Sequence, residues 1–219
     1  MNETLDLDSG LSQLDMEAGS DAGMPPGARE KLGAYIDLLA KWNRTYNLTA
    51  IREPERMVTH HVLDALAVLP HLQGNPARSS LSLLDVGSGG GVPAIPLAIA
   101  RPGWHVVALD SSHKKGAFLQ QAAIELSLPN LEVVTARVED FRPAAPFDVV
   151  ISRAFSDLAT FVASSARHLA EGGRLVAMKG VHPDEEIAQL PPDIRVVASP
   201  SLKVPGLDGE RHLILMERV

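Results

Sequence analysis

The spacing of apolar residues changes along the chain from helical to strand-like. Two stretches near the amino terminus repeat apolar residues every three to four positions, the first after Pro25-Pro26 and the second from about Pro54. Their apolar stripes are Leu32, Tyr35, Ile36 and Leu39, then Val58, Val62, Ala65, Leu66 and Leu69. From Leu81 onward, short apolar runs typical of buried strands alternate with helical patterns. The runs are LSLLDV, HVVALD, LEVVTA, FDVVIS and GRLVAMK, followed by IRVVASP and HLILMERV.

This alternation predicts a doubly wound, Rossmann-like α/β fold with a mostly parallel sheet. Helices are expected at 94–100, at 157–170 and between the second and third runs. The last two strand patterns have no helix between them, which predicts a terminal antiparallel hairpin. We expect an acidic mobile tail over residues 1–24, an N-terminal helical cap over 25–80 that ends in a linker at 73–80, and the main domain over 81–219.

Composition narrows the class of protein. Hydrophobic residues make up 45% and charged residues 21% of the 219 positions, which excludes wholesale disorder. The chain has no cysteine, so disulfides, thiolate metal sites and a cysteine nucleophile are excluded. No apolar stretch approaches the ~20 residues that cross a bilayer, and the acidic start is unlike a secretory signal. We therefore expect a cytoplasmic protein without a membrane partner.

The net charge of −7 is concentrated at the amino terminus. Residues 1–24 hold six acids and no Lys or Arg, which leaves 21 acids and 20 bases in the rest of the chain. The main part is thus nearly neutral, so a local basic patch for nucleic acid remains possible.

The glycine-rich segment LDVGSGGGVP carries the strongest chemical signal. It follows a predicted strand and precedes a helix, where glycines let a ligand lie against bare backbone. Dinucleotide-binding folds use a similar loop, but they place a small residue where this chain has Val92. Asp85 before the first glycine suits a ligand with a cationic, amino-acid-like group better than a pyrophosphate. A ligand-free turn is the alternative.

Three further positions lie at predicted strand ends. Asp110 follows the second strand, where a carboxylate can accept both ribose hydroxyls of a nucleoside; the alternative is a helix cap. Val138 and Glu139 follow the third strand, where they can close over an adenine; the alternative is a solvated acidic turn. Arg153 follows the fourth and can orient a base or phosphate; the alternative is a surface ion pair.

The segment after the fourth strand also narrows the kind of atom that can accept a transferred group. It reads ISRAF and lacks the Asn/Asp-Pro-Pro-Tyr type of motif found in many methyltransferases that act on amino groups. An exocyclic amine needs a group that takes its proton, whereas a ring nitrogen such as guanine N7 already presents a lone pair.

The aromatic and histidine residues say less about function. Trp42 and Tyr46 can stack on RNA, but we favour a role in pinning the loop onto the core, because aromatic residues are only 4% of the chain. His60, His61 and His182 show no metal-ligand spacing, so no metal is expected.

These blocks together resemble a known family. KWNRTYNLT, HHVLDALAVLP, LLDVGSGGGVPAIPLAIARP, ALDSSHKKGAFL, ARVEDF, FDVVISRAFSDL, MKG and LDGERHLILM are similar to the small-subunit (16S) ribosomal RNA guanine-N7 methyltransferases, also called glucose-inhibited division protein B. The resemblance runs from about Lys31 to the carboxyl terminus. Ala94 stands where many members have glycine, a change that hardly affects the assignment.

The resemblance implies a Rossmann-like methyltransferase that uses S-adenosyl-methionine and methylates guanine N7 in 16S ribosomal RNA. Its cofactor positions match Gly87, Val92, Val138, Glu139 and Arg153. Gly89 of the glycine loop and Asp110 at the second strand end complete the expected cofactor site on their own sequence signals. We expect Arg153 to position the reactants without a general base. The expected RNA contacts, all near predicted strand ends, are Lys114, Lys115, Arg137, Lys179 and Arg211.

Two other functions remain open. A nicotinamide-dependent oxidoreductase shares the glycine loop and Asp110, but neither tyrosine begins a Tyr-x-x-x-Lys motif. A non-catalytic RNA-binding or ribosome-assembly factor could keep the same fold. The substrate is expected to be small-subunit RNA or a ribosomal particle, and no obligate protein partner is evident.

Overall fold

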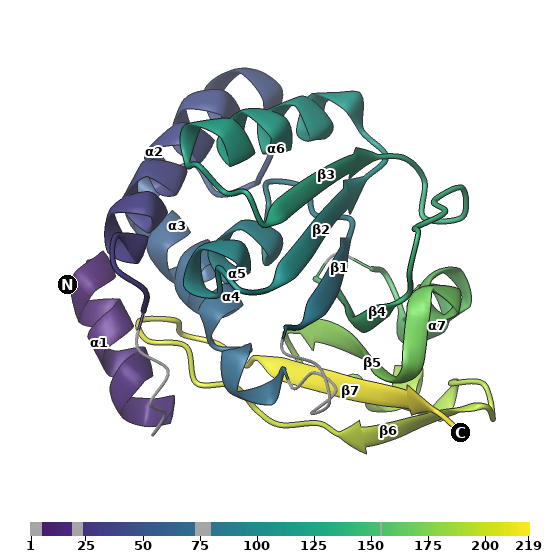
Figure 1. Cartoon of the computed structure of the whole chain (residues 1–219). Coiled ribbons are helices and arrows are strands. Elements are labelled where there is room, and N and C mark those ends of the chain that lie inside the picture. The colour runs from purple at the N-terminus through teal and green to yellow at the C-terminus, as the bar shows by residue number, and fades with distance from the viewer. Residues whose placement is uncertain (1–5, 19–23, 73–79, 154) are drawn as a thin grey trace.

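A seven-stranded sheet forms the centre of the computed structural model, which describes residues 6–18, 24–72, 80–153 and 155–219 (Figure 1). The strands stand in the order β3-β2-β1-β4-β5-β7-β6. Their bounds are β1 Ser82–Val86, β2 His105–Asp110, β3 Leu131–Thr135, β4 Phe147–Ser152, β5 Leu169–Lys179, β6 Ile194–Ala198 and β7 His212–Arg218.

Strands β1 to β5 pair in parallel, and β7 runs antiparallel to both neighbours, β5 and β6. The predicted parallel sheet with a terminal antiparallel hairpin is therefore confirmed. The last strand, β7, lies between β5 and β6 rather than at the edge. The strand order reverses at β1, which pairs with both β2 and β4. In such sheets, ligands bind in the crevice at the carboxyl ends of the strands beside this reversal.

Helices cover both faces of the sheet. Successive side chains of a strand point to opposite faces, so alternate residues join different cores. On one face Leu83, Val106 and Ala108 join the larger core with helices α5 and α6. On the other face Leu84 and Val107 join a second core with α7. This double burial explains why the strands contain nearly continuous apolar runs.

Helices follow β1, β2, β4 and β5, whereas the described residues between β3 and β4 and between β6 and β7 contain no helix. The helical bounds are α1 Leu7–Ala18, α2 Ala28–Tyr46, α3 Pro54–Met57, a π-helix Val58–Leu63, α4 Asp64–Leu66, a 3₁₀-helix Leu69–His71, α5 Ala94–Ala100, α6 His113–Glu125, α7 Leu158–Ser165, a 3₁₀-helix Ala166–His168 and α8 Asp184–Ala188.

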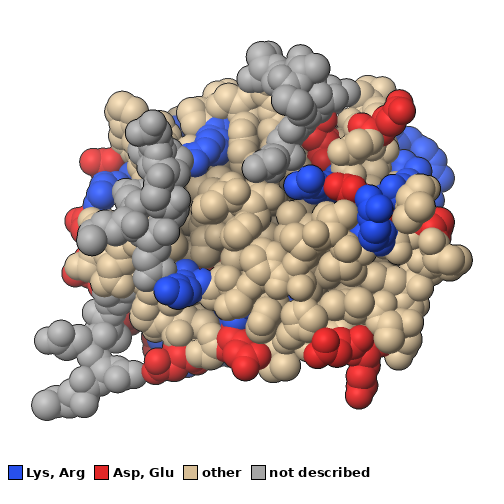
Figure 2. All heavy atoms as spheres, turned by 90° about the horizontal axis from the view of Figure 1, so that it is seen from below, with Lys and Arg blue, Asp and Glu red and all other residues tan. Residues whose placement is uncertain are grey.

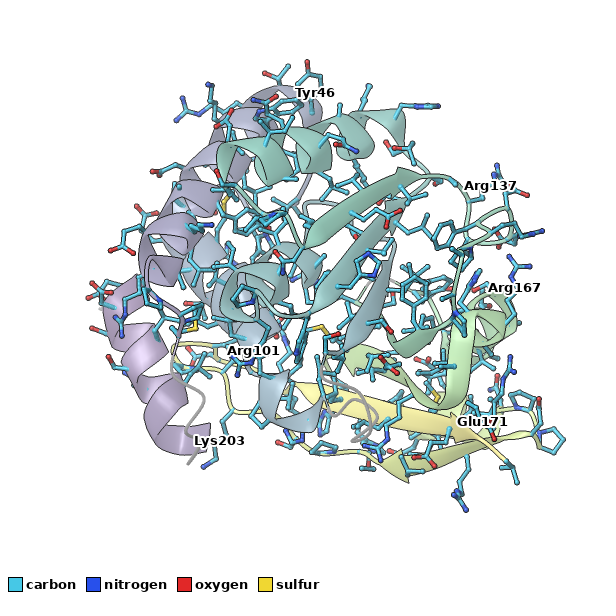
Figure 3. All side chains as sticks on the ribbon, viewed as in Figure 1. Tyr46, Arg101, Arg137, Arg167, Glu171 and Lys203 are labelled. Atoms are coloured by element: carbon cyan, nitrogen blue, oxygen red, sulfur yellow. The ribbon has the colours of Figure 1, made fainter. Side chains whose placement is uncertain are left out.

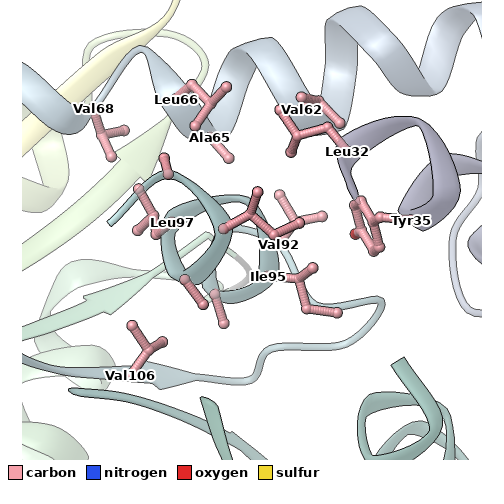
Figure 4. Close-up of a cluster of buried hydrophobic side chains, with 14 of the residues drawn as sticks. Leu32, Tyr35, Val62, Ala65, Leu66, Val68, Val92, Ile95, Leu97 and Val106 are labelled. Atoms are coloured by element: carbon pink, nitrogen blue, oxygen red, sulfur yellow. The ribbon is translucent and has the colours of Figure 1, made fainter. Parts of the chain in front are cut away.

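The amino-terminal helices pack directly on one face of the sheet domain. Leu32 and Tyr35 of α2 and Val62 of the π-helix lie around α5, close to Ile95 (Figure 4). These side chains are 0% exposed, so they belong to the same core as the strands. We propose that the boundary at residue 80 marks a change in the sequence pattern only. Residues 25–80 then form a helical layer that packs on the domain that follows.

The expected mobile tail over residues 1–24 is wrong for the segment that forms α1, and residues 1–5 and 19–23 lie outside the described part of the chain. Residues 7–18 form α1, and Leu11 is 2% exposed in the large core. Leu7 and Leu14 pack against the same core, so a short apolar stripe at helical spacing exists within the acidic background. The Asp6 carboxylate accepts hydrogen bonds from the backbone N–H of Ser9, at 2.8 Å, and from its hydroxyl. An Asp at this position is the local sequence signal for the start of α1.

Other boundaries differ less. The helix expected at 157–170 ends at Ser165, and β5 begins at Leu169, where it pairs with Phe147 of β4. The short helix α8 was not predicted. The expected linker falls mostly on residues 73–79, which lie outside the described part of the chain. Within the described residues, none of the helices has the length and apolar character needed to span a membrane.

Candidate active site

The glycine loop joins β1 to α5 at the carboxyl edge of the sheet. Gly87, Gly89 and Gly91 have φ values of 77°, 58° and 86°, a region that side chains with a Cβ rarely adopt. Gly91 also packs tightly, because a Cβ there would lie 2.3 Å from Ile95 Cδ1. The space around Gly87 is open instead, with nothing within 4 Å of such a Cβ. Gly87 therefore offers bare backbone to a ligand.

A first cavity of about 480 Å³ opens beside this loop. It gathers residues from the ends of β1, β2 and β3 and from the segment after β4: Val86, Gly87, Leu109, Asp110, Ser111, Lys115, Ala136, Arg137, Val138, Glu139 and Phe155. Four residues expected around a nucleoside, Gly87, Asp110, Val138 and Glu139, thus share one cavity. Its volume lies within the range of small-molecule sites.

A second cavity of about 180 Å³ lies over the rest of the loop. Val92, Gly89 and Arg153 line it, and so do Gly87 and Lys115, which also line the first cavity. The two cavities therefore adjoin. Leu39, Leu48, Thr49 and His61 of the amino-terminal helical layer complete the wall.

The structure assigns Asp110 more than one role. It is 6% exposed, and its Oδ2 accepts a hydrogen bond from the Gly89 N–H at 2.9 Å. Its Oδ1 accepts one from the Ser112 N–H at the start of α6, also at 2.9 Å, and Lys115 Nζ lies 3.7 Å from Oδ2. The carboxylate thus supports the glycine loop and the helix start while facing the first cavity. The ribose and capping interpretations are compatible, because each carboxylate oxygen accepts more than one hydrogen bond.

The backbone of Val138 is fixed by side chains that follow α7. Its carbonyl accepts hydrogen bonds from Arg167 Nη2 at 2.6 Å, and His168 Nε2 lies 3.1 Å from the same oxygen. Figure 3 shows Arg167 and Arg137 on the same side of the molecule. Val138 is buried, whereas Glu139 beside it is exposed. An apolar side chain next to an exposed carboxylate provides a surface for an aromatic base and an acceptor for an amino group.

Asp85 lies beneath the loop, fully buried. Its Oδ2 accepts a hydrogen bond from the Ala94 N–H at 3.2 Å, but its Oδ1 is buried without a partner. Burial raises the pKa of Asp85 from 3.8 to about 7, although Ser88 and Ala94 oppose the shift by hydrogen bonding. A cationic group bound over the loop would favour the charged carboxylate.

Arg153, at the end of β4, reaches into the amino-terminal helical layer. Its Nη1 donates to the His60 carbonyl at 2.9 Å and lies 3.2 Å from His61 Nδ1 and 3.5 Å from Asp64 Oδ2. A surface ion pair with a freely solvated acid is excluded, because the Asp64 side chain is only 3% exposed. Burial raises the pKa of Asp64 while the charges of Arg153 and Arg211 oppose that shift.

A third cavity of about 300 Å³ lies on the other side of Arg153. Asp64, Met178, Lys179, Gly180 and Arg211 complete its lining. The structure therefore brings Arg153 together with Lys179 and Arg211, two of the expected RNA contacts. Both are ion-paired within the chain, Lys179 to Glu186 at 2.8 Å and Arg211 to Asp64 at 3.0 Å.

The remaining expected RNA contacts lie elsewhere. Lys115 and Arg137 line the first cavity, and Lys114 is exposed on α6. These five cations consequently do not form one cluster. The face shown in Figure 2 has an uncharged centre with basic and acidic side chains around its periphery.

Trp42 and Tyr46 behave differently from each other. The centroid of the Trp42 ring lies 5.7 Å from that of Phe118 of α6 and 5.2 Å from that of Tyr46, and Trp42 packs against the large core. Tyr46 is 44% exposed at the end of α2, where Figure 3 shows it on the outside. The core interpretation thus holds for Trp42 only.

His61, Asp64 and Phe155 are site residues that the sequence alone did not reveal. His61 and Asp64 stand three positions apart on one helical face, a spacing that could have suggested a shared role. Burial and the nearby charge of Arg153 lower the pKa of His61 to about 4. Among the described residues, no group of three His, Asp or Glu side chains is arranged to hold a metal ion.

Sequence comparison decides the family. The profile described as "rRNA small subunit methyltransferase G" matches residues 28–214. The chain belongs to this family. A relative from Laribacter hongkongensis, named ribosomal RNA small subunit methyltransferase G, is 53% identical over 214 residues and covers 98% of both chains. One of the same name from Burkholderia pseudomallei is 56% identical over 194 residues, 86% of this chain and 82% of that protein. Family membership makes this chain a methyltransferase.

Solved structures share the fold. The glycopeptide N-methyltransferase MtfA complexed with S-adenosyl-L-homocysteine superposes with a TM-score of 0.60 at 15% identity, over 72% of this chain and 90% of that one. TrmN from Thermus thermophilus gives 0.53 at 20% identity, over 71% and 48%. At such identity the similarity concerns the fold alone, and it confirms the methyltransferase-like architecture expected from the sequence.

Proposed function

We propose that this chain transfers a methyl group from S-adenosyl-methionine to N7 of a guanine in small-subunit (16S) ribosomal RNA. The observation that carries the proposal is the pair of adjoining cavities over the glycine loop, combined with family membership. The first has room and polarity for a nucleoside, and the second for an amino-acid tail. The proposed place of the reaction is the cytoplasm, where ribosomal RNA is found.

The residues fit this donor on structural grounds. Gly87 presents open backbone, and Asp110 at the wall of the first cavity can accept hydrogen bonds from ribose hydroxyls. Val138 and Glu139 face the position of an adenine. Asp85 lies buried beneath the loop with a raised pKa, and an ammonium group bound over the loop would favour its charged form.

The donor supplies an electrophilic methyl group on a sulfonium. Guanine N7 carries an unprotonated lone pair, so no side chain has to remove a proton. The chain's own contribution is then orientation and exclusion of water, with the reacting atoms held about 3–3.5 Å apart. Arg153 is placed for orientation because it lines both the second and third cavities.

Two measurements test the proposal. Calorimetry with S-adenosyl-methionine, S-adenosyl-homocysteine and NAD should show binding of the first two only. Transfer of a labelled methyl group should then be followed on purified 16S RNA and on small ribosomal subunits, with mapping of the modified base. Label on a guanine N7 is the expected result. Cofactor binding without transfer to either substrate would indicate a non-catalytic RNA-binding role, and tight NAD binding an oxidoreductase.

A further inference from the structure

The third cavity has a cationic wall whose side chains are held by acids of this chain, Asp64 for the two arginines and Glu186 for the lysine. Arg153, Lys179 and Arg211 face it, from the end of β4, the end of β5 and the start of β7. Among the described residues that line it, Asp64 is the one acid against three cations. Long basic side chains normally lose much rotamer freedom when they are fixed. Here the fold has fixed them before any ligand arrives.

Asp64 bridges the two arginines. Its Oδ1 accepts a hydrogen bond from Arg211 Nε at 3.0 Å, and its Oδ2 lies 3.5 Å from Arg153 Nη1. The Asp64 side chain is 3% exposed, whereas those of Arg211 and Arg153 are 26% and 30% exposed. The carboxylate therefore lies behind the guanidinium groups, which remain accessible from the cavity.

The position of this bridge connects it with the reaction. Arg153 lines the cavity over the glycine loop and also the third cavity, so it stands between them. If the donor occupies the loop side, an acceptor must approach from the other side of Arg153. Guanidinium groups suit phosphate and carbonyl oxygens, both of which a guanine nucleotide presents.

We propose that Asp64 is a positioning residue that aligns Arg153 and Arg211 for the acceptor nucleotide, which enters the third cavity. This inference rests on the proposed methyl transfer and adds to it the subsite of the acceptor. Pre-organisation of the two arginines lowers the ordering cost of RNA binding. Asp64 itself need not touch the RNA.

The test uses Asp64→Asn in the full-length protein and two separate readouts. Affinity for a 16S RNA transcript should fall by about 3- to 30-fold, and kcat/KM for that RNA by about 10- to 100-fold. The Kd for S-adenosyl-homocysteine should change less than the RNA affinity does, because Asp64 lines neither cavity over the glycine loop and acts on that site only through Arg153. RNA affinity is measurable without methyl transfer, so it separates a failure of this inference from a failure of the proposed function.

A matched control comes from another buried acid of the sheet domain. Asp148 is 4% exposed at the opposite end of β4, where it accepts hydrogen bonds from Ser82. Asp148→Asn should lower the melting temperature while leaving RNA affinity and kcat/KM near wild type. If Asp64→Asn behaves in the same way, Asp64 is merely structural and the inference is wrong.

Coupling to Arg211 gives a second, independent outcome. Arg211→Met should itself weaken RNA binding, and Asp64→Asn should cost markedly less in that background than in the wild type. Additive losses would overturn the inference. If Asp64→Asn does not fold, Arg211→Met still tests whether the third cavity binds RNA. Arg211 is partly exposed, so its replacement should disturb the fold less.

Discussion

At the scale of single residues, carboxylates organise the candidate site. Asp110 supports the glycine loop from the end of β2, and Asp85 lies beneath the loop. Asp64 holds Arg153 and Arg211 at the third cavity. Each is at most 6% exposed. Burial disfavours the charged form of a carboxyl group unless hydrogen bonds or counter-charges compensate for its desolvation. Substitutions of these residues therefore separate structural from functional contributions.

Asp110→Ala should weaken binding of S-adenosyl-homocysteine by about ten- to more than a hundredfold. The reason is the loss of a charged acceptor, which contributes roughly 1.5–3 kcal/mol. Stability should also fall by about 1–3 kcal/mol, because the N–H groups of Gly89 and Ser112 lose their acceptor. Calorimetry and urea unfolding measure the two effects.

Asp157→Ala is the matched control for that experiment. Asp157 caps α7 by accepting a hydrogen bond from the Thr160 N–H at 2.7 Å, and it lines none of the three cavities. It should lose about 1 kcal/mol of stability with unchanged ligand affinity. If Asp110→Ala shows the same pattern, Asp110 is only a cap and the ribose assignment is wrong.

Asp85→Asn should alter the pH dependence of stability. The folded pKa of about 7 lies above the ordinary 3.8, so the folded protein holds a proton that the unfolded chain releases. The wild type therefore loses stability from this group as pH rises from about 4 to about 7. Asparagine removes that loss, and the variant should gain about 2–3 kcal/mol relative to wild type between pH 5 and pH 8.

Urea unfolding at both pH values measures this gain. The exposed Asp37 of α2 provides the comparison, since Asp37→Asn changes the same charge without changing a buried group. Equal pH dependence of Asp85→Asn and wild type would show that Asp85 titrates as an ordinary carboxyl.

At the scale of elements, the amino-terminal helices supply part of the site as well as part of the core. The π-helix and α4 contribute His61 and Asp64, and the loop before α3 contributes Thr49, whose Oγ1 lies 2.9 Å from His61 Nε2. Helix α1 packs on the π-helix from outside. Changes in α1 should therefore act mainly on stability. They should affect the site only indirectly, through the position of the π-helix.

Leu11→Ala should lower the free energy of unfolding by about 2–4 kcal/mol, as expected for a buried leucine. Asp8→Ala should cost less than about 1 kcal/mol, since its 2.7 Å ion pair with Arg29 is solvent-exposed. Both values come from urea unfolding. A loss at Leu11 no larger than that at Asp8 would restore the interpretation of residues 1–24 as a mobile tail.

At the scale of the whole molecule, the candidate site depends on the convergence of distant segments. The glycine loop, the ends of β2, β3 and β4, and the amino-terminal helices all meet at the carboxyl edge of one sheet (Figure 1). A ligand bound there contacts elements from both cores. Its binding should therefore stabilise the global fold and not merely a loop.

S-adenosyl-homocysteine at about 100 times its Kd should add about 2.7 kcal/mol to stability. For a domain of this size, that corresponds to a rise in Tm of roughly 5–11 °C. Scanning calorimetry with and without the ligand measures the shift, and NAD at the same concentration should give none. A shift with NAD alone would contradict the proposed donor.

Local patterns in the sequence determined the strands, most helices and the glycine loop, because period-two and period-3.6 burial and positive φ are properties of neighbouring residues. They also placed Gly87, Asp110, Val138 and Glu139 at strand ends, and parallel strands bring such ends to one edge. Only the tertiary structure decided the docking of α1, the insertion of β7 between β5 and β6, and the pairing of Asp64 with Arg211 across 147 positions. These depend on the packing of segments that are remote in the chain, and no local spacing encodes which partner a buried charge will find.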